Sequence, residues 1–351
     1  MESFAQRVNA WYKRGHRDLP WRRTKDPYRI WISEIMLQQT RTETVIPYYK
    51  RFLEIYPDVF ALASCDETEL LKAWEGLGYY SRARNLRRTA KIIADQYNGM
   101  MPDNIATLRK LPGIGPYTAG AIASIAYRIP AAAVDGNFER VFCRYTGETT
   151  DPSLPATRKA IWQKAEQWVP KEEPDVFANA MMELGACICT PKAPSCADCP
   201  LREDCKAYAQ GMPESYPIKL SKKKLRTESR QILLLLSGKE VLVIKRKERL
   251  LKGLYVFPDL VSDFDLTKIY SKLEDRGIKA IYVGSAGTAR HVFTHLIWEM
   301  EIHIFRCLKV PVNVKEDELW ADEEQLRSIP MPTAVRRARE VALERLANRN
   351  G

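Results

Sequence analysis

Four cysteines near the middle of the chain have the residue type and the spacing of a metal-binding loop. They follow the pattern C-x6-C-x2-C-x5-C and are Cys189, Cys196, Cys199 and Cys205. Thiolates this close along a chain pair poorly as disulfides, whereas they are common ligands of zinc ions and iron–sulfur clusters. The N-terminus does not read as a secretory signal, so we expect the eight cysteines to reside in a reducing compartment.

A glycine-rich turn at residues 111–120 has the composition of a phosphate-binding hairpin. The sequence LPGIGPYTAG places Gly113 and Gly115 just before a predicted helix. Backbone N–H groups at the start of such a helix favour a phosphate, and Pro116 suits its first turn. The turn resembles a helix–hairpin–helix DNA-binding motif, which implies phosphate contacts from Gly113, Gly115 and Thr118. A purely structural turn between two helices is the alternative.

Glu34 lies in an apolar stretch with helical spacing, WISEIMLQQT. A buried carboxyl group is costly unless it is protonated or paired, and burial raises its pKa. A carboxyl group with a raised pKa is a good general acid. From the residues alone, a position on the wet face of the helix is an equally good interpretation. By the same standard, Asp135 in VDGN is an ordinary Asp-Gly turn.

Together these motifs resemble the endonuclease III and MutY family of DNA glycosylases. The resemblance covers nearly the whole chain and implies a [4Fe–4S] cluster on the four cysteines. It implies that Glu34 protonates adenine and that Asp135 stabilises the sugar cation, with hydrogen bonds to Asp135 from Asn137 and Tyr117. Strand-cutting members carry a lysine at the position of Tyr117. A tyrosine there implies a monofunctional glycosylase.

The resemblance also implies a substrate. The segment DLPWR matches the start of the family's adenine pocket, so Trp21 and Arg22 are expected to line the base. The implied reaction is the removal of adenine mispaired with 8-oxoguanine or guanine, in base excision repair. The implied partner is double-stranded DNA carrying that mismatch, bound by a monomer.

Four further residues are expected at the gap that a flipped base leaves in the duplex. Side chains inserted from the minor groove fill such a gap. The segment WEGLGYYSR matches a family loop that enters the DNA stack, and the resemblance implies that Tyr79 and Gln39 fill the hole. It further implies that Thr40 and Leu77 touch the base opposite the adenine. For Tyr79, an aromatic core contact is the alternative.

The C-terminal part resembles the MutT-like (Nudix-like) domain of the same family. The stretch GLYVFP carries this likeness, and no acidic metal-binding box follows it, so we expect no nucleotide hydrolysis. Phe293, Thr294 and His295 match the family's Phe-Ser-His loop, which reads the oxidised guanine. Threonine replaces serine here, which keeps the hydroxyl group and adds a methyl group. A strand edge without a ligand is the alternative.

The predicted architecture is a mainly α helix–hairpin–helix glycosylase domain followed by a smaller α+β Nudix-like domain. We expect the first at 1–210, a linker at 211–228 and the second at 229–351. Turn signals and apolar spacing predict helices at 28–52, 67–77, 83–97, 118–127, 137–145, 156–168, 174–187, 268–276 and 334–346. Strands are predicted at 230–236, 241–245 and 293–305.

The charge balance favours a polyanionic partner. The chain has 55 basic and 44 acidic residues and a net charge of +11. The surplus clusters at 14–29, 82–91 and 222–226, although such runs are often plain solvated surface. No stretch has the apolar length of a membrane span, so we expect no membrane partner. Localisation is expected to be intracellular, in the bacterial cytoplasm with the nucleoid or in a nucleus.

Three alternatives remain open from the sequence. Four cysteines alone would also suit zinc. Another helix–hairpin–helix glycosylase would excise an oxidised pyrimidine or a mismatched thymine. A non-catalytic iron–sulfur DNA-binding protein would need neither Glu34 nor Asp135.

Overall fold

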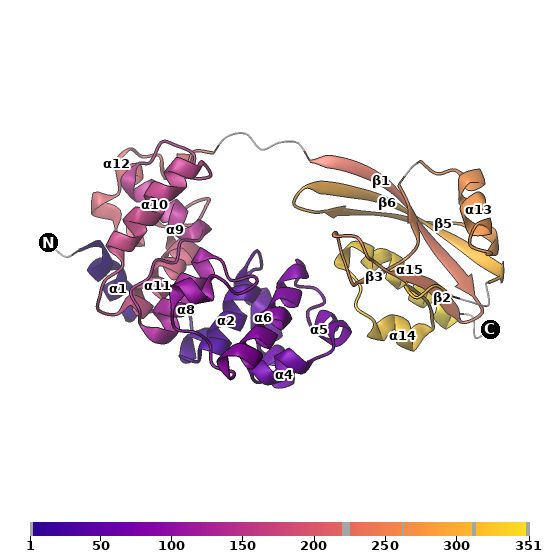
Figure 1. The fold of residues 1–351 in the computed structure, drawn as a ribbon. Helices are drawn as coiled ribbons and strands as arrows, with labels where there is room; N and C mark the ends of the chain where they lie inside the picture. Colours follow the sequence, from indigo (N-terminus) through magenta and orange to yellow (C-terminus); the bar gives the residue numbers. More distant parts are fainter. Residues whose placement is uncertain (1–2, 220–224, 262, 311–313, 349–351) are drawn as a thin grey trace. The chain divides into compact units, whose positions relative to one another are not determined.

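A computed structural model of the chain describes residues 3–219, 225–261, 263–310 and 314–348 (Figure 1). The chain divides into two compact units, and each consists of two segments. The first unit comprises residues 1–65 and 84–222, and the second comprises 66–83 and 223–351. Residues 66–83, which lie within the predicted helical domain, therefore pack with the C-terminal part of the chain.

The first unit is built from helices, as predicted. They are α1 (Phe4–Arg14), α2 (Pro27–Leu37), α3 (Thr42–Ile55), α4 (Val59–Ser64), most of α6 (Ser81–Tyr97), α7 (Ile105–Leu108), α8 (Pro116–Tyr127), α9 (Gly136–Thr146), α10 (Pro155–Trp168), α11 (Pro174–Glu183) and α12 (Lys206–Ala209). Local sequence fixes many helix starts. Asp26 accepts a hydrogen bond from the Tyr28 amide at the start of α2, and Asp135 accepts one from the Phe138 amide at the start of α9.

The helix predicted at 28–52 is in fact two helices. α2 ends at Leu37 and α3 begins at Thr42. Between them Gln39 has a φ of +58°, which a helix cannot accommodate. Apolar residues continue at helical spacing on both sides of the break because both helices bury a face in the same unit. Periodicity alone therefore could not detect the interruption.

The second unit contains a seven-stranded mixed sheet. Its strands are β1 (Arg226–Ser237), β2 (Glu240–Lys245), β3 (Tyr255–Val256), β4 (Asp259–Leu260), β5 (Lys279–Val292), β6 (Leu296–Lys309) and β7 (Glu318–Ala321). The main path runs β3-β2-β1-β6-β5, with β4 beside β1 and β7 beside β2. β1 and β6 are parallel, whereas β5 and β6 form a long antiparallel hairpin. The helices are α5 (Glu67–Ala73), α13 (Leu266–Glu274), α14 (Glu323–Ser328) and α15 (Arg336–Ala347).

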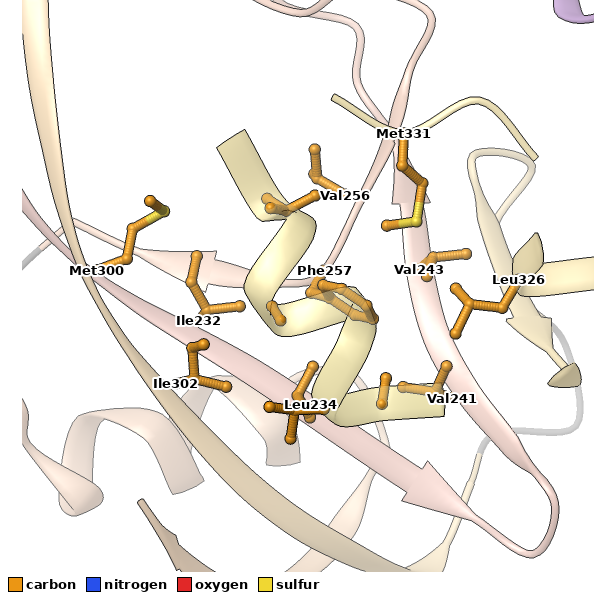
Figure 2. Packing of buried hydrophobic residues seen from close by; sticks show 14 of the residues in the cluster. Ile232, Leu234, Val241, Val243, Val256, Phe257, Met300, Ile302, Leu326 and Met331 are labelled. Atoms are coloured by element: carbon orange, nitrogen blue, oxygen red, sulfur yellow. The ribbon is translucent and has the colours of Figure 1, made fainter. Parts of the chain in front are cut away.

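From Arg230 to Leu236, strand β1 is buried on both of its faces. Ile232 and Leu234 join a core with α15, in which Phe257 is fully buried (Figure 2). The alternate residues Leu233 and Leu235 join a second core with α13. This two-sided burial explains the continuous apolar run ILLLL, which a one-sided strand would interrupt with polar residues.

Most predicted elements of the second unit are confirmed, with differences at the β5–β6 turn and at the start of β1. The strand predicted from Phe293 begins only at Leu296, so residues 293–295 form the turn of the hairpin. β1 begins at Arg226, inside the segment predicted as a linker. Of the third basic run, residues 222–224 lie outside the described residues. Among the described helices, none has the length and apolarity needed to cross a membrane.

Candidate active site

A cavity of about 690 Å³ in the first unit gathers predicted site residues from distant parts of the sequence. The predicted residues that line it are Trp21, Arg22, Glu34, Gln39, Thr40, Gly113, Gly115, Tyr117, Thr118, Asp135 and Asn137. They come from α2 and its flanks, from the start of α8 and from the start of α9. Packing of α2 against α8 and of α8 against α11 brings these elements together.

Glu34 is the most deeply buried carboxyl group of the cavity, with 3% of its surface exposed. Burial raises its pKa from 4.5 to about 7, although a hydrogen bond from Tyr117 opposes the shift. The Tyr117 hydroxyl donates to Glu34 Oε2 at 2.7 Å. The sequence predicted that Tyr117 would bond to Asp135 instead. The difference arises because Tyr117 lies in the first turn of α8, which packs on α2, the helix that carries Glu34.

Asp135 is held at the N-terminus of α9 by two hydrogen bonds. Its Oδ1 accepts from the Phe138 amide at 2.7 Å, and its Oδ2 accepts from Asn137 Nδ2 at 2.8 Å. The Asn137 bond agrees with the sequence-based prediction. Burial raises the pKa of Asp135 above its ordinary value, while these donors act in the opposite direction. The cavity therefore holds one buried carboxyl group, Glu34, and one partly buried carboxyl group, Asp135, each with a separate set of donors.

Glu183 is a site residue that the sequence reasoning missed. It is buried at the end of α11 and accepts hydrogen bonds from Arg17 Nη2 at 2.7 Å and from Arg22 Nη2 at 2.8 Å. Burial alone would raise the pKa of Glu183, but these bonds outweigh it and lower the pKa to about 2. Arg22 is consequently fixed beside Trp21, which is also buried. The signal was available, because a lone glutamate in the apolar run MMELGA needs a cationic partner.

Arg140 connects Asn137 to the cysteine loop, and the sequence reasoning missed this residue as well. Its Nη2 donates to Asn137 Oδ1 at 2.9 Å and to the Gly185 carbonyl at 2.6 Å. Its Nε donates to the Cys189 carbonyl at 2.7 Å. A Cβ atom at Gly185 would lie only 2.4 Å from Asn137 Cβ, so a glycine is required here. Two side chains, those of Arg140 and Asn137, thus link the first cysteine of the loop to Asp135 through hydrogen bonds.

The four loop cysteines are free thiols, and all four are partly buried. Burial, together with the neighbouring thiols of Cys189, Cys205 and Cys196, raises the pKa of Cys199 to about 12. Arg144 is buried beside them, and its Nη1 donates to Cys189 Sγ at 3.3 Å. As they stand, no three His, Cys, Asp or Glu side chains among the described residues could hold a metal ion. Four neighbouring thiols with a guanidinium group at one sulfur nevertheless fit the donor chemistry of an iron–sulfur cluster.

The hairpin at 111–120 has the backbone that its glycines predict, but one of its three predicted phosphate contacts is buried. Gly113 has a φ of +79°, and a Cβ atom there would lie 2.8 Å from Asn85 Cβ. Gly115 caps α8, and Pro116 occupies the first position of that helix. Thr118 is 2% exposed and accepts a hydrogen bond from Gln38 Nε2 at 3.3 Å. Its hydroxyl group therefore faces the interior of the unit.

Gln39 and Tyr79, the two residues predicted to fill the DNA gap, share an uncommon backbone conformation. Their φ angles are +58° and +48°, a region that side chains other than glycine rarely adopt. Such strain concentrates at functional sites, where the surrounding structure holds it in place. Tyr79 is 45% exposed, whereas Leu77, predicted to touch DNA from the same loop, is 5% exposed. The loop therefore presents Tyr79 and packs Leu77 inside.

Phe293, Thr294 and His295 form the turn between β5 and β6. The Phe293 amide donates to the Leu296 carbonyl at 2.8 Å, and its ring packs edge-on to Trp298 with centroids 4.8 Å apart. Thr294 and His295 are exposed. Phe293 thus anchors a turn that presents the two polar residues to solvent.

Comparison with protein families matches both parts of the chain. Residues 32–170 match the HhH-GPD superfamily of base excision DNA repair proteins, and residues 231–340 match the NUDIX domain.

Curated relatives named adenine DNA glycosylase are similar over nearly the whole chain. The protein of Buchnera aphidicola subsp. Baizongia pistaciae is 33% identical, over 95% of this chain and 94% of its own length. The Homo sapiens protein is 31% identical, over 95% of this chain and 73% of its own length.

Solved structures resemble the helical part. A thermostable thymine-DNA glycosylase is 33% identical with a TM-score of 0.55, and the match covers 59% of this chain and 95% of that one. A trapped endonuclease III–DNA covalent intermediate is 26% identical with a TM-score of 0.51, over 59% of this chain and 94% of that one.

Proposed function

Because the chain belongs to the adenine DNA glycosylase family, we propose that it excises adenine mispaired with 8-oxoguanine or guanine. The names of its relatives support adenine removal in base excision repair. The observation that carries the proposal is the pair of carboxyl groups in one cavity of about 690 Å³, Glu34 buried and Asp135 partly buried. Two carboxyl groups in different environments are what acid-assisted cleavage of a glycosidic bond requires.

The proposed reaction begins with adenine flipped into the cavity beside Trp21 and Arg22. Glu34 in its protonated form gives its proton to adenine N7, which makes the base a neutral leaving group. The bond between C1′ and N9 breaks, and its electron pair leaves with the base. Asp135, as a carboxylate, stabilises the positive charge on the sugar or bonds to it transiently. Water then adds at C1′, the proton it loses returns to the Glu34 carboxylate, and an abasic site remains.

The pKa shifts support this division of roles. A pKa of about 7 keeps a large fraction of Glu34 protonated near neutral pH, as a general acid needs. Asp135 accepts from the Phe138 amide and from Asn137, and these donors favour its charged form. Tyr117 is proposed to tune the acid through its hydrogen bond to Glu34. Because its phenol cannot form a Schiff base, the strand is left uncut.

Recognition of the mismatch is proposed to fall to other residues. Gln39 and Tyr79 fill the gap left by the flipped base, with Thr40 and Leu77 nearby. Thr294 and His295 read the oxidised guanine, and their exposure on the β5–β6 turn supports this role. Backbone amides of the turn at Gly113 and Gly115 hold a DNA phosphate.

The cysteines Cys189, Cys196, Cys199 and Cys205 are proposed to hold a [4Fe–4S] cluster. When bound, the cluster would act as a scaffold for the loop at 189–205. Arg144 and Arg140 tie this loop to α9 and to Asn137. Loss of the cluster is therefore expected to disturb Asp135 indirectly.

The test is base release from matched duplexes under single-turnover conditions. Duplexes carry adenine opposite 8-oxoguanine, guanine or cytosine, and a fourth carries thymine opposite guanine. Free base and strand breaks are measured separately. The proposal predicts adenine release opposite 8-oxoguanine and guanine only, with breaks appearing only after alkali. Release of thymine in place of adenine, or release of no base at all, would refute it.

A further inference from the structure

We propose that Lys72, Glu75 and Arg339 form a positioning site that locks the Tyr79 loop to the Nudix-like domain. The loop comprises residues 74–80, between α5 and α6. The inference rests on the proposed function, because it takes Tyr79 as the residue that fills the DNA gap. It adds that the domain proposed to read the opposite base also sets the position of this residue.

Two cationic side chains bind backbone carbonyls at the end of helix α14. Lys72, on α5, donates through Nζ to the carbonyls of Arg327 at 2.7 Å and Ile329 at 3.3 Å. Arg339, on α15, donates through Nη2 to the carbonyls of Leu326 at 2.6 Å and Arg327 at 2.9 Å. The last carbonyls of a helix have no partner within the helix, and cationic side chains can satisfy them. Both cations share the Arg327 carbonyl as an acceptor, so α5 and α15 are tied to the same end of α14.

Glu75, the second residue of the loop, joins the two cations. Its Oε2 accepts from Lys72 Nζ at 2.6 Å, and its Oε1 accepts from Arg339 Nη1 at 2.5 Å. The side chains of Glu75 and Arg339 are only 24% and 16% exposed. Because these ion pairs are partly buried, water screens them less, and each contributes more to stability than an exposed ion pair does. Removal of either cation takes away one of the two cationic partners that hold the Glu75 carboxylate.

The end of α14, which receives the loop, is held in place because residues beside it belong to a hydrophobic core. Leu326 and Met331 belong to the hydrophobic core that surrounds Phe257 (Figure 2). The Tyr80 hydroxyl donates to the Met331 carbonyl at 3.4 Å. The loop is therefore anchored through Glu75 near its start and through Tyr80 at its end.

Contacts within the loop pass this anchoring on to Tyr79. Trp74 Nε1 donates to the Gly78 carbonyl at 3.1 Å. Arg82 Nη2 donates to the carbonyls of Leu77 at 2.9 Å and Gly78 at 3.1 Å, and its guanidinium lies 5.5 Å from the centre of the Tyr79 ring. The positive φ of Tyr79 persists only where such contacts over-determine the backbone. Loss of the contacts between the loop and the end of α14 is expected to release Tyr79 from this conformation.

The test is a double-mutant cycle in the full-length chain, with Arg339→Met and Tyr79→Ala. Single-turnover adenine release is measured opposite 8-oxoguanine. Arg339→Met is expected to lower the rate by about tenfold, and the double variant is expected to be no slower than Tyr79→Ala alone. Effects that multiply would overturn the proposal, because they would place Arg339 on a path independent of Tyr79.

Two further variants keep the test decisive. Arg337→Met removes a charge from the same helix without touching the loop, since Arg337 pairs with exposed Glu340, and its rate is expected to stay at the wild-type value. If Arg339→Met does not fold, Lys72→Met replaces it in the cycle with the same expectation. Failure of the proposed function is distinguishable, because the wild-type chain itself would then not release adenine opposite 8-oxoguanine.

Discussion

The cavity around Glu34 and the loops that carry Tyr79 and Thr294 are organised in opposite ways. In the cavity, Glu34 is buried and Asp135 is partly buried, and each accepts hydrogen bonds from neighbouring donors. In the loops, the side chains proposed to meet DNA are exposed, while the residues beneath them are fixed. The comparison suggests that the chemistry is assembled before DNA binds, whereas recognition is completed by the DNA itself. Substitutions in the cavity should therefore change the rate of base release, whereas a substitution at Thr294 should change the preference between mismatches.

The largest effect is expected from Asp135→Asn in the cavity. Loss of one pre-organised charge from an active site costs up to about a thousandfold in rate, and we expect a loss of that size in adenine release. Asparagine is an equally good N-cap, so the start of α9 and the thermal stability should be preserved. DNA affinity, measured in parallel, should not change. Release within about tenfold of the wild-type rate would contradict the role of Asp135.

Glu34→Gln should stabilise the folded chain at alkaline pH. The folded-state pKa of Glu34 is raised from 4.5 to about 7, so the folded state binds the proton more tightly than the unfolded state. The free energy of unfolding therefore falls as the pH rises from 4.5 to 7, by on the order of 3 kcal/mol. Glutamine carries no such penalty.

Denaturant unfolding of both chains at pH 5 and pH 8 checks this prediction. The free energy of unfolding of the variant, minus that of the wild type, should be larger at pH 8 than at pH 5. An equal difference at both pH values would contradict the prediction, because it would mean that folding does not raise the pKa of Glu34.

Tyr117→Phe should move the alkaline limb of the pH–rate profile to higher pH. The hydroxyl donates to Glu34 and favours its charged form, so removal of the bond raises the pKa of Glu34 further. Because the protonated acid is the active form, release should persist to higher pH, by about one unit. A limb that moves to lower pH, or stays in place, would contradict the hydrogen bond as the tuning element.

The smallest effect is expected from Thr294 at the hairpin turn. Thr294→Val keeps the shape and removes the hydroxyl, which should reduce the preference for 8-oxoguanine over guanine by several-fold, about the worth of one hydrogen bond. Thr294→Ser is the matched control and should keep the preference. An unchanged ratio in the valine variant would remove this hydroxyl from recognition.

The sequence predicted more of the catalytic cavity than of its supports. Glu34 and Asp135 were singled out through the resemblance to the glycosylase family, because from the residues alone each had an ordinary interpretation. Glu183 and Arg140 were missed because their partners lie far away in sequence, and only the packing of helices brings them together. The break at Gln39 was missed because apolar periodicity continues across it. The grouping of residues 66–83 with the C-terminal part depends on contacts such as Glu75–Arg339, which no local pattern reveals.

The central claim is that chemistry and recognition are separate properties of the two regions. The most direct measurement is the ratio of single-turnover adenine release opposite 8-oxoguanine to release opposite guanine, in the wild type, Glu34→Gln and Thr294→Val. The account predicts that Glu34→Gln slows both reactions by the same factor and leaves the ratio unchanged, whereas Thr294→Val lowers the ratio. A ratio that changes as much in Glu34→Gln as in Thr294→Val would contradict it.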